Sequence, residues 1–173
     1  MKLSIFQIPI YIGNIDVDKI KLSNQDFEKT WLSETKSSYN FVNKIDTTSW
    51  KYLTDIIVKL LKEDFNFDYK LSLEKIWENK YEKDDFQENH IHIGSHFSFI
   101  IYKKVDKSNT IFFRPDKNLF ESFYGNNFEL FNNEYVPECK SNQIIIFPSC
   151  IEHMVCKNNL SETISGNLTI KRV

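Results

Sequence analysis

Histidine is the residue type in this chain whose placement most clearly suggests chemistry. All four histidines lie in two places, because His90, His92 and His96 are clustered and His153 lies far downstream. In a β-strand, residues i and i+2 project from the same face, so His90 and His92 can direct two imidazoles toward one point. A neutral imidazole is the most common metal-binding side chain near pH 7, and three protein ligands leave positions open for substrate or O2. The spacing predicts a metal site, with a pair of surface histidines as the competing interpretation.

A second motif favours the metal site over the surface interpretation. The apolar run 144–147 leads into Pro148 and a turn, and His153 follows five residues after the proline. A hairpin of this kind can return a histidine to the strand that carries His90 and His92. An edge strand ended by a proline would explain Pro148 but not the histidine. We therefore expect His90, His92 and His153 to bind one metal ion.

The elements that must position these histidines are mostly β-strands. Apolar residues from Trp50 to Leu61 recur at helical spacing after candidate N-caps at 47–49, which predicts one amphipathic helix of about four turns. After Phe67 the pattern changes to short β-type runs separated by turn-forming residues. These runs are YKLSLEKIWENKY, HFSFIIYKK, NTIFFRP, NQIIIFP and TISGNLTIKR, and an earlier strand is expected over residues 3–12. Several strands after one helix indicate a sandwich or barrel with the helix packed outside.

Length and composition favour one globular domain. With 173 residues, 41% of them hydrophobic, the chain can bury a core that offsets its ordering entropy. We expect residues 1–68 to support a core barrel over 69–173, and the aromatic connection 116–142 to fold over the barrel mouth. A formal charge of -2 gives no nucleic-acid signature, and no segment reaches transmembrane length. Three cysteines without a C-x-x-C pair indicate a reducing compartment, which predicts a cytoplasmic location.

Several short motifs follow one another in the second half of the chain. They are W-x-N at 77–79, D-F-Q-x-x-H-x-H at 85–92, F-P-S-x-x-x-H at 147–153 and I-S-G-N at 164–167. Together they resemble the phage-type 2-oxoglutarate and Fe(II)-dependent oxygenases. The resemblance implies a mainly β, double-stranded β-helix (jelly-roll) barrel with one or two N-terminal packing helices. It also implies a non-haem iron dioxygenase that uses Fe(II), 2-oxoglutarate and O2 to hydroxylate a small molecule or a side chain, in the host cytoplasm if phage-encoded.

The resemblance also implies roles for the histidines. His90 and His153 would bind the iron, and His92 occupies the position that is Asp in many relatives of the wider superfamily. A third imidazole in place of a carboxylate would leave the Fe(II) site one unit more positive, which should alter its redox potential. The resemblance leaves open whether His92 itself binds the iron.

Binding of 2-oxoglutarate is where the sequence departs from the family pattern. The family holds the distal carboxylate with a basic residue shortly before the I-S-G-N segment, through a charge-assisted pair. This chain has S-E-T at residues 161–163 instead. We expect Arg114, at the end of the run IFFRP, to be the substitute, with Tyr102 and Ser165 as further cosubstrate-binding residues.

Two other functions are compatible with the same residues. A cupin would use His96 as a fourth ligand and no 2-oxoglutarate, since H-x-H-x3-H and P-S-C-I-E-H loosely match that family's metal motifs. A catalytically degenerate barrel that binds a ligand or a partner chain is favoured only by the missing basic residue. Metal binding with 2-oxoglutarate turnover would favour the oxygenase, whereas metal binding without turnover would favour the cupin or the binding barrel.

Overall fold

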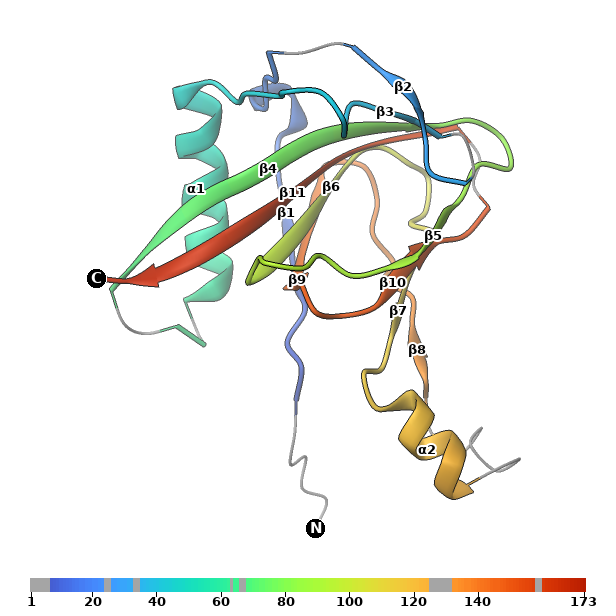
Figure 1. Ribbon diagram of the computed structural model, residues 1–173. Helices are drawn as coiled ribbons and strands as arrows, with labels where there is room; N and C mark the ends of the chain where they lie inside the picture. Colours follow the sequence, from blue (N-terminus) through green and yellow to red (C-terminus); the bar gives the residue numbers. More distant parts are fainter. Residues whose placement is uncertain are drawn as a thin grey trace.

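Two antiparallel β-sheets form the framework of the structure. The computed structural model describes residues 7–23, 26–32, 35–62, 64–65, 68–124, 132–157 and 160–173. Within these ranges the strands form a seven-stranded and a four-stranded sheet. Figure 1 shows the long strands β4 and β11 crossing the molecule, with the smaller sheet on one side and helix α1 on the other. This arrangement confirms the predicted mainly β jelly-roll fold.

The larger sheet has the strand order β1-β9-β6-β11-β4-β3-β2. Its strands are β1 (Tyr11–Asn14), β2 (Glu28–Thr30), β3 (Thr35–Ser37), β4 (Tyr69–Tyr81), β6 (Phe97–Lys104), β9 (Gln143–Pro148) and β11 (Ser161–Arg172). Every neighbouring pair in this sheet is antiparallel. The runs predicted from residue 69 onward are therefore confirmed as strands.

The smaller sheet has the order β5-β10-β7-β8. Its strands are β5 (Gln87–His90), β7 (Thr110–Phe113), β8 (Glu134–Tyr135) and β10 (His153–Val155). Strand β10 lies between β5 and β7, and its register places His153 opposite both His90 and Phe112. The predicted hairpin return of His153 to the strand carrying His90 is confirmed.

Burial on both faces explains why β6 and β9 are apolar without interruption. On β6, Phe99 and Ile101 belong to a core with helix α1, whereas Ile100 and Tyr102 belong to a second core between the sheets. Strand β9 alternates in the same way, with Ile144 and Ile146 on the α1 side and Ile145 and Phe147 on the other. Successive side chains of a strand point to opposite faces, so a strand covered on both faces needs apolar residues throughout.

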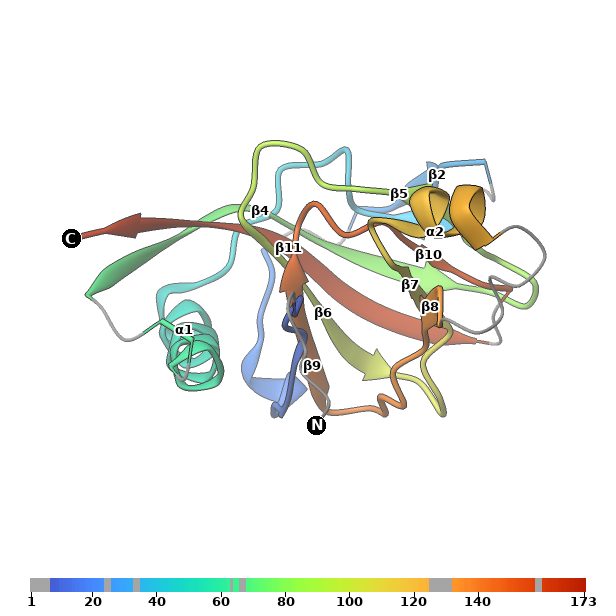
Figure 2. The same cartoon turned by 90° about the horizontal axis from the view of Figure 1, so that it is seen from below.

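Helix α1 (Thr47–Leu61) covers the outer face of the larger sheet, as Figure 2 shows from below. Leu53, Ile57 and Leu61 are fully buried at helical spacing. The N-cap is Asp46, whose side chain accepts hydrogen bonds from the backbone N–H groups of Thr48 and Ser49. The expected cap at residues 47–49 is therefore wrong by one residue, because the Asp46 carboxylate satisfies two donors of the first turn at once.

The N-terminal strand is shorter than expected. Residues 7–10 are irregular and β1 covers Tyr11–Asn14, because the pairing with β9 runs only from Tyr11, opposite Ile146, to Asn14, opposite Gln143. The connection 116–142 contains helix α2 (Lys117–Tyr124) and strand β8, and its residues 125–131 lie outside the described part of the chain. A short 3-10 helix, η1 (Val17–Lys19), follows β1. None of the described helices is long and apolar enough to span a membrane.

Candidate metal centre and adjoining pocket

Three histidines meet between the ends of β5 and β10. His90 is the last residue of β5, and His153 is the first residue of β10 and pairs with it. His92 lies beyond the end of β5, so the expectation that both H-x-H residues share one strand is wrong. A tether replaces the strand, because the His92 N–H donates to the Ser149 carbonyl over 2.9 Å. The F-P-S turn after β9 thus holds the histidine loop in place.

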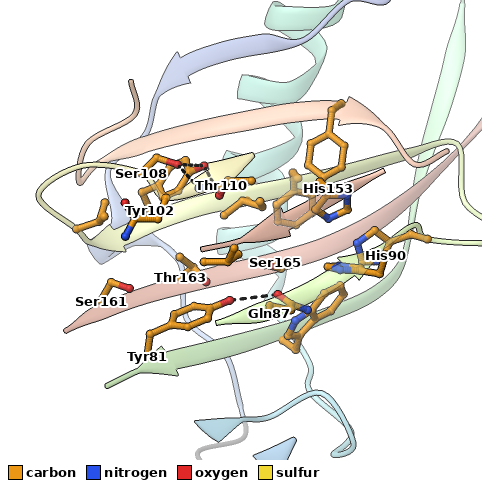
Figure 3. Close-up of a pocket in the computed structure, with 18 residues that line it drawn as sticks. Tyr81, Gln87, His90, Tyr102, Ser108, Thr110, His153, Ser161, Thr163 and Ser165 are labelled. Carbon is orange, nitrogen blue, oxygen red and sulfur yellow. Dashed lines mark hydrogen bonds between the residues drawn. The ribbon is translucent and has the colours of Figure 1, made fainter. Parts of the chain in front are cut away.

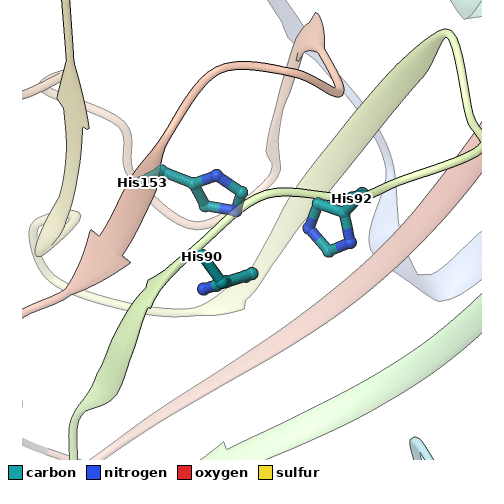
Figure 4. Close-up of side chains that lie close together, drawn as sticks. All are labelled: His90, His92 and His153. Atoms are coloured by element: carbon teal, nitrogen blue, oxygen red, sulfur yellow. The ribbon is translucent and has the colours of Figure 1, made fainter. Parts of the chain in front are cut away.

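The three imidazoles are close enough to share one ion. Each offers a ring nitrogen, and these atoms all lie within 4.8 Å of one another. The ring centroid of His90 lies 4.2 Å from that of His153 and 5.0 Å from that of His92. Figure 4 shows the three rings facing a common space. Histidine nitrogens bind first-row metals at about 2.0–2.1 Å, so small ring rotations suffice for all three to reach one ion.

Backbone hydrogen bonds fix which ring nitrogen is available. The Nδ1 of His90 lies 2.7 Å from the Glu88 carbonyl, and the Nδ1 of His153 lies 2.9 Å from the Ile151 carbonyl. A carbonyl oxygen only accepts, so each Nδ1 carries the proton and each Nε2 keeps its lone pair. Such a partner on the second nitrogen is the usual way in which a metal-binding histidine is oriented.

Burial keeps the imidazoles neutral. His153 is only 2% exposed, and burial, with a smaller contribution from nearby His90, lowers the pKa of His153 to about 3. Burial and the same neighbour lower the pKa of His92 to about 4. Burial also lowers the pKa of His90, although its hydrogen bond to the Glu88 carbonyl opposes the shift. All three rings are therefore unprotonated at neutral pH, as metal binding requires.

A polar pocket extends from the histidines between the two sheets. Figure 3 shows His90 and His153 at one end of it and Tyr102, Ser108 and Thr110 toward the other. Along β11 alternate residues face this space, namely Ser161, Thr163 and Ser165. No Lys, Arg, Asp or Glu is among the described residues that line it. Predicted residues Tyr102 and Ser165 are thus both in the pocket wall.

Arg114 is not brought to this pocket by the described structure. Strand β7 ends at Phe113, and the Arg114 side chain forms two hydrogen bonds to Asp116, of 2.6 Å and 3.1 Å. It lines a separate surface pocket together with Ile8 and Tyr135. Arg114 is not among the described residues that line the pocket beside the histidines, and its expected role in holding 2-oxoglutarate stays a prediction.

The fourth ligand expected for a cupin is also misplaced. The His96 side chain is exposed, and its Nδ1 accepts a hydrogen bond of 2.9 Å from the Ile170 N–H. It belongs to no metal-binding group found in the described residues, whereas His90, His92 and His153 do. The structure therefore removes the four-ligand cupin site.

The motif residues outside the pocket hold the strands together. Ser98 on β6 forms hydrogen bonds with Ser149 (2.8 Å) and with the Asn167 side chain (3.0 Å), all three being buried. Gly166 allows β11 to pass close to its neighbours, because a Cβ there would lie 2.9 Å from the Lys75 carbonyl and would overlap the Phe99 ring. The F-P-S and I-S-G-N motifs therefore brace the barrel beside the histidines.

Two features of the pocket escape sequence reasoning. Thr110 joins the wall because β7 pairs with β10, and Ser108 is held beside it by a hydrogen bond from its N–H to the Cys139 carbonyl; nothing in their local sequence marks them. The indole N–H of Trp77 is buried with no hydrogen-bond partner in the described structure, and its ring lies 5.7 Å from that of His92. An unpaired buried donor in a pocket wall fits an acceptor on a bound molecule. Only the W-x-N motif pointed to this position.

A jelly-roll barrel with three neutral imidazoles at one end of an internal pocket is the arrangement of a metal-binding barrel protein. The model of a family described as "Putative 2OG-Fe(II) oxygenase" matches residues 75–165, more than half of the chain. The chain therefore belongs to the 2OG-Fe(II) oxygenase family, whose members use Fe(II) and 2-oxoglutarate. No curated protein sequence matches the chain significantly.

Solved structures support the fold. A 2OG-Fe(II) oxygenase family oxidoreductase from Burkholderia pseudomallei is 13% identical with a TM-score of 0.51, and the match covers 92% of this chain and 68% of that one. HygX from Streptomyces hygroscopicus, solved with nickel, 2-oxoglutarate and hygromycin B, is 9% identical with a TM-score of 0.53, over 88% and 74%. The α-ketoglutarate-dependent epimerase SnoN from nogalamycin biosynthesis is 8% identical with a TM-score of 0.55, over 85% and 67%. At these identities the likeness establishes the fold alone.

Proposed function

We propose that the 173 residues form one oxygenase domain in which His90, His92 and His153 hold the Fe(II) of a 2-oxoglutarate-dependent hydroxylase. Residues 1–68 support the barrel in this proposal and 69–173 form its core. The observation that carries it is the convergence of three neutral imidazoles, two with Nδ1 protonated, at one end of the pocket. When bound, Fe(II) and 2-oxoglutarate supply O2 activation, with release of succinate and CO2 and oxidation of a substrate C–H bond.

The donor set fits a divalent first-row cation. Imidazole suits iron, and three protein ligands leave positions open for a cosubstrate. His92 completes the set with a neutral nitrogen, so the protein ligands add no negative charge to offset the positive charge of the metal. The rings of Phe147 and Phe112 pack against His153 with centroids 4.8 Å and 5.7 Å away, which fixes its orientation and keeps water from its buried side.

The pocket fits an organic acid in its polar character. Tyr102 and Ser165 are the cosubstrate-binding residues of this proposal, and the unpartnered Trp77 N–H is a further donor near the histidines. The proposal does not include Arg114, because its guanidinium lies outside this pocket. The apolar side chains that share the wall, such as Phe147 and Val155, and the absence of charged side chains among the described lining residues favour a dry space, where hydrogen bonds orient a ligand strongly.

The surface beside the histidines suggests where a substrate approaches. Glu152, next to His153, accepts a hydrogen bond from Asn89 over 2.6 Å and pairs with Lys117 of α2 over 2.7 Å. This network ties α2 to both histidine-bearing strands, so α2 forms part of the rim. We propose a small molecule or a side chain of another molecule as substrate, and action in the cytoplasm, the host cytoplasm if the chain is phage-encoded.

The test is an anaerobic titration of the metal-free protein with Fe(II) and then 2-oxoglutarate. Formation of the visible charge-transfer band of the chelate, followed by succinate on admission of O2, is the expected result. The His90→Ala protein should show neither signal, while the His96→Asn protein, altered at an exposed histidine outside the cluster, should show both. Tight iron binding without band or succinate would refute the proposed function and favour a binding barrel.

A further inference from the structure

The pocket end remote from the histidines is polar but uncharged. Tyr102, Ser108 and Thr110 are each no more than 2% exposed, and Ser161 and Thr163 face the same space from β11. A buried carboxylate is usually held by Arg or Lys, since an unpaired buried charge is costly. No such cation is among the described lining residues, so hydroxyl and amide groups are the polar partners that this end offers.

The basic side chain next to Tyr102 on β6 is directed away from the pocket. Lys103 follows Tyr102 on β6, so its side chain lies on the opposite face of the sheet. There it forms ion pairs with Glu78 at 2.6 Å and with Glu162 at 3.4 Å. Reaching the pocket would require Lys103 to leave two carboxylates and cross the sheet, so it cannot act as a cationic clamp.

The hydroxyl groups at the remote end already form a connected set. Ser108 Oγ donates to the Tyr102 hydroxyl over 2.9 Å, and the Tyr102 hydroxyl lies 3.2 Å from Thr110 Oγ1. The Ser108 Oγ in turn accepts the Thr110 N–H over 3.2 Å, which fixes its position. Hydroxyl hydrogens rotate to suit their partners, so these groups can redirect from one another toward a ligand oxygen.

We propose that Tyr102, Ser108 and Thr110 form an uncharged hydroxyl clamp that holds the distal end of the 2-oxo acid cosubstrate, in place of a basic residue. The inference rests on the proposed function, because the histidines and their iron must bind the 2-oxo acid group at the other end. The clamp has a consequence for specificity. Hydroxyl donors bind a carboxylate more strongly than a neutral carbonyl, but the carboxylate loses more solvation on burial, so the two effects largely offset each other.

The experiment compares two 2-oxo acids of the same size on the anaerobic Fe(II) protein. One is 2-oxoglutarate, and the other is 2,5-dioxohexanoate, in which a methyl ketone replaces the distal carboxylate. The dissociation constants come from the visible charge-transfer band of each chelate. We expect the two constants to agree within about tenfold, whereas a buried cation would favour the carboxylate by about 100-fold or more.

Variants identify the groups responsible. Tyr102→Phe and Ser108→Ala each remove one hydroxyl with little change in shape, and each should weaken both acids about tenfold. Arg114→Ala and Lys103→Met are the matched controls, and they should leave both constants unchanged. Nickel-induced thermal stabilisation, which needs only the histidines, shows whether each variant is folded, and Thr110→Val replaces any variant that is not.

Three outcomes would overturn the inference. A 100-fold preference for 2-oxoglutarate that disappears in Arg114→Ala or Lys103→Met would show a cationic clamp. Unchanged constants in folded Tyr102→Phe and Ser108→Ala proteins would show that the hydroxyls do not touch the ligand. Absence of a charge-transfer band with either acid would overturn the proposed function as well, which distinguishes the two failures.

Discussion

Replacing His153 by alanine should remove most of the stabilisation that a divalent metal gives this protein. A ligand at 100 times its dissociation constant stabilises the folded state by about 2.7 kcal/mol. For a chain of this size each kcal/mol raises the melting temperature by about 2–4 °C, so saturating metal should raise it by about 5–11 °C. His153 supplies one of three nitrogens from a position that is 2% exposed, and no other described histidine can replace it.

The size of the loss follows from the ligand count. Losing only the orienting partner of a metal ligand weakens binding about 10–100-fold, so losing the ligand itself should cost at least about 100-fold. At the same metal concentration the remaining stabilisation is then about 0.4 kcal/mol, or about 1–2 °C. Differential scanning fluorimetry with Ni(II), which needs no anaerobic handling, measures both values as shifts from each variant's own metal-free melting temperature.

The matched control is His96→Asn. This histidine is exposed and outside the cluster, and asparagine offers an acceptor oxygen for the Ile170 N–H that Nδ1 now accepts. The control should keep the full metal-induced shift. A full shift in the folded His153→Ala protein, or its loss in His96→Asn, would refute the three-histidine centre.

Three further predictions concern the walls of the pocket and its bracing. Ser98→Ala leaves the buried side chains of Ser149 and Asn167 without a partner, so urea denaturation should show a free energy of unfolding lower by about 1–3 kcal/mol. A decrease below about 0.5 kcal/mol would contradict the bracing role. Gly166→Ala places a methyl group against Phe99 and the Lys75 carbonyl, so the same assay should show a free energy of unfolding lower by about 1–3 kcal/mol. Unchanged stability would disprove the close approach of β11 to these neighbours. Trp77→Phe keeps a ring but removes the unpartnered N–H, so 2-oxoglutarate should bind the Fe(II) protein about tenfold more weakly. The nickel-induced rise in melting temperature should stay the same, and equal affinity for 2-oxoglutarate would exclude the indole as a donor.

The part of the site that the sequence predicted is the part set by local patterns. The hairpin after Pro148 and the H-x-H spacing were enough to predict that His153 returns to the strand that carries His90. The strands from residue 69 onward were predictable because their apolar runs reflect burial on one or both faces. Local patterns of this kind depend on strand geometry alone and need no knowledge of the register between strands.

The remainder depended on tertiary geometry. The position of Arg114 could not be predicted, because the direction of the chain after Phe113 determines which face receives its side chain. His92 reaches the cluster through a hydrogen bond to Ser149, which is distant in sequence. The Thr110 hydroxyl enters the pocket through the pairing of β7 with β10, and Ser108 is held there by its backbone hydrogen bond to Cys139. Register between distant strands is decided by packing, and a single sequence carries little information about it.

The most direct measurement is a crystal structure of the iron-loaded protein, prepared anaerobically, with an anomalous difference map at the iron edge. A single strong peak about 2.0–2.2 Å from Nε2 of His90, His92 and His153 is the predicted result. A peak at any other place, or one bound by only two of these nitrogens, would contradict the three-histidine centre.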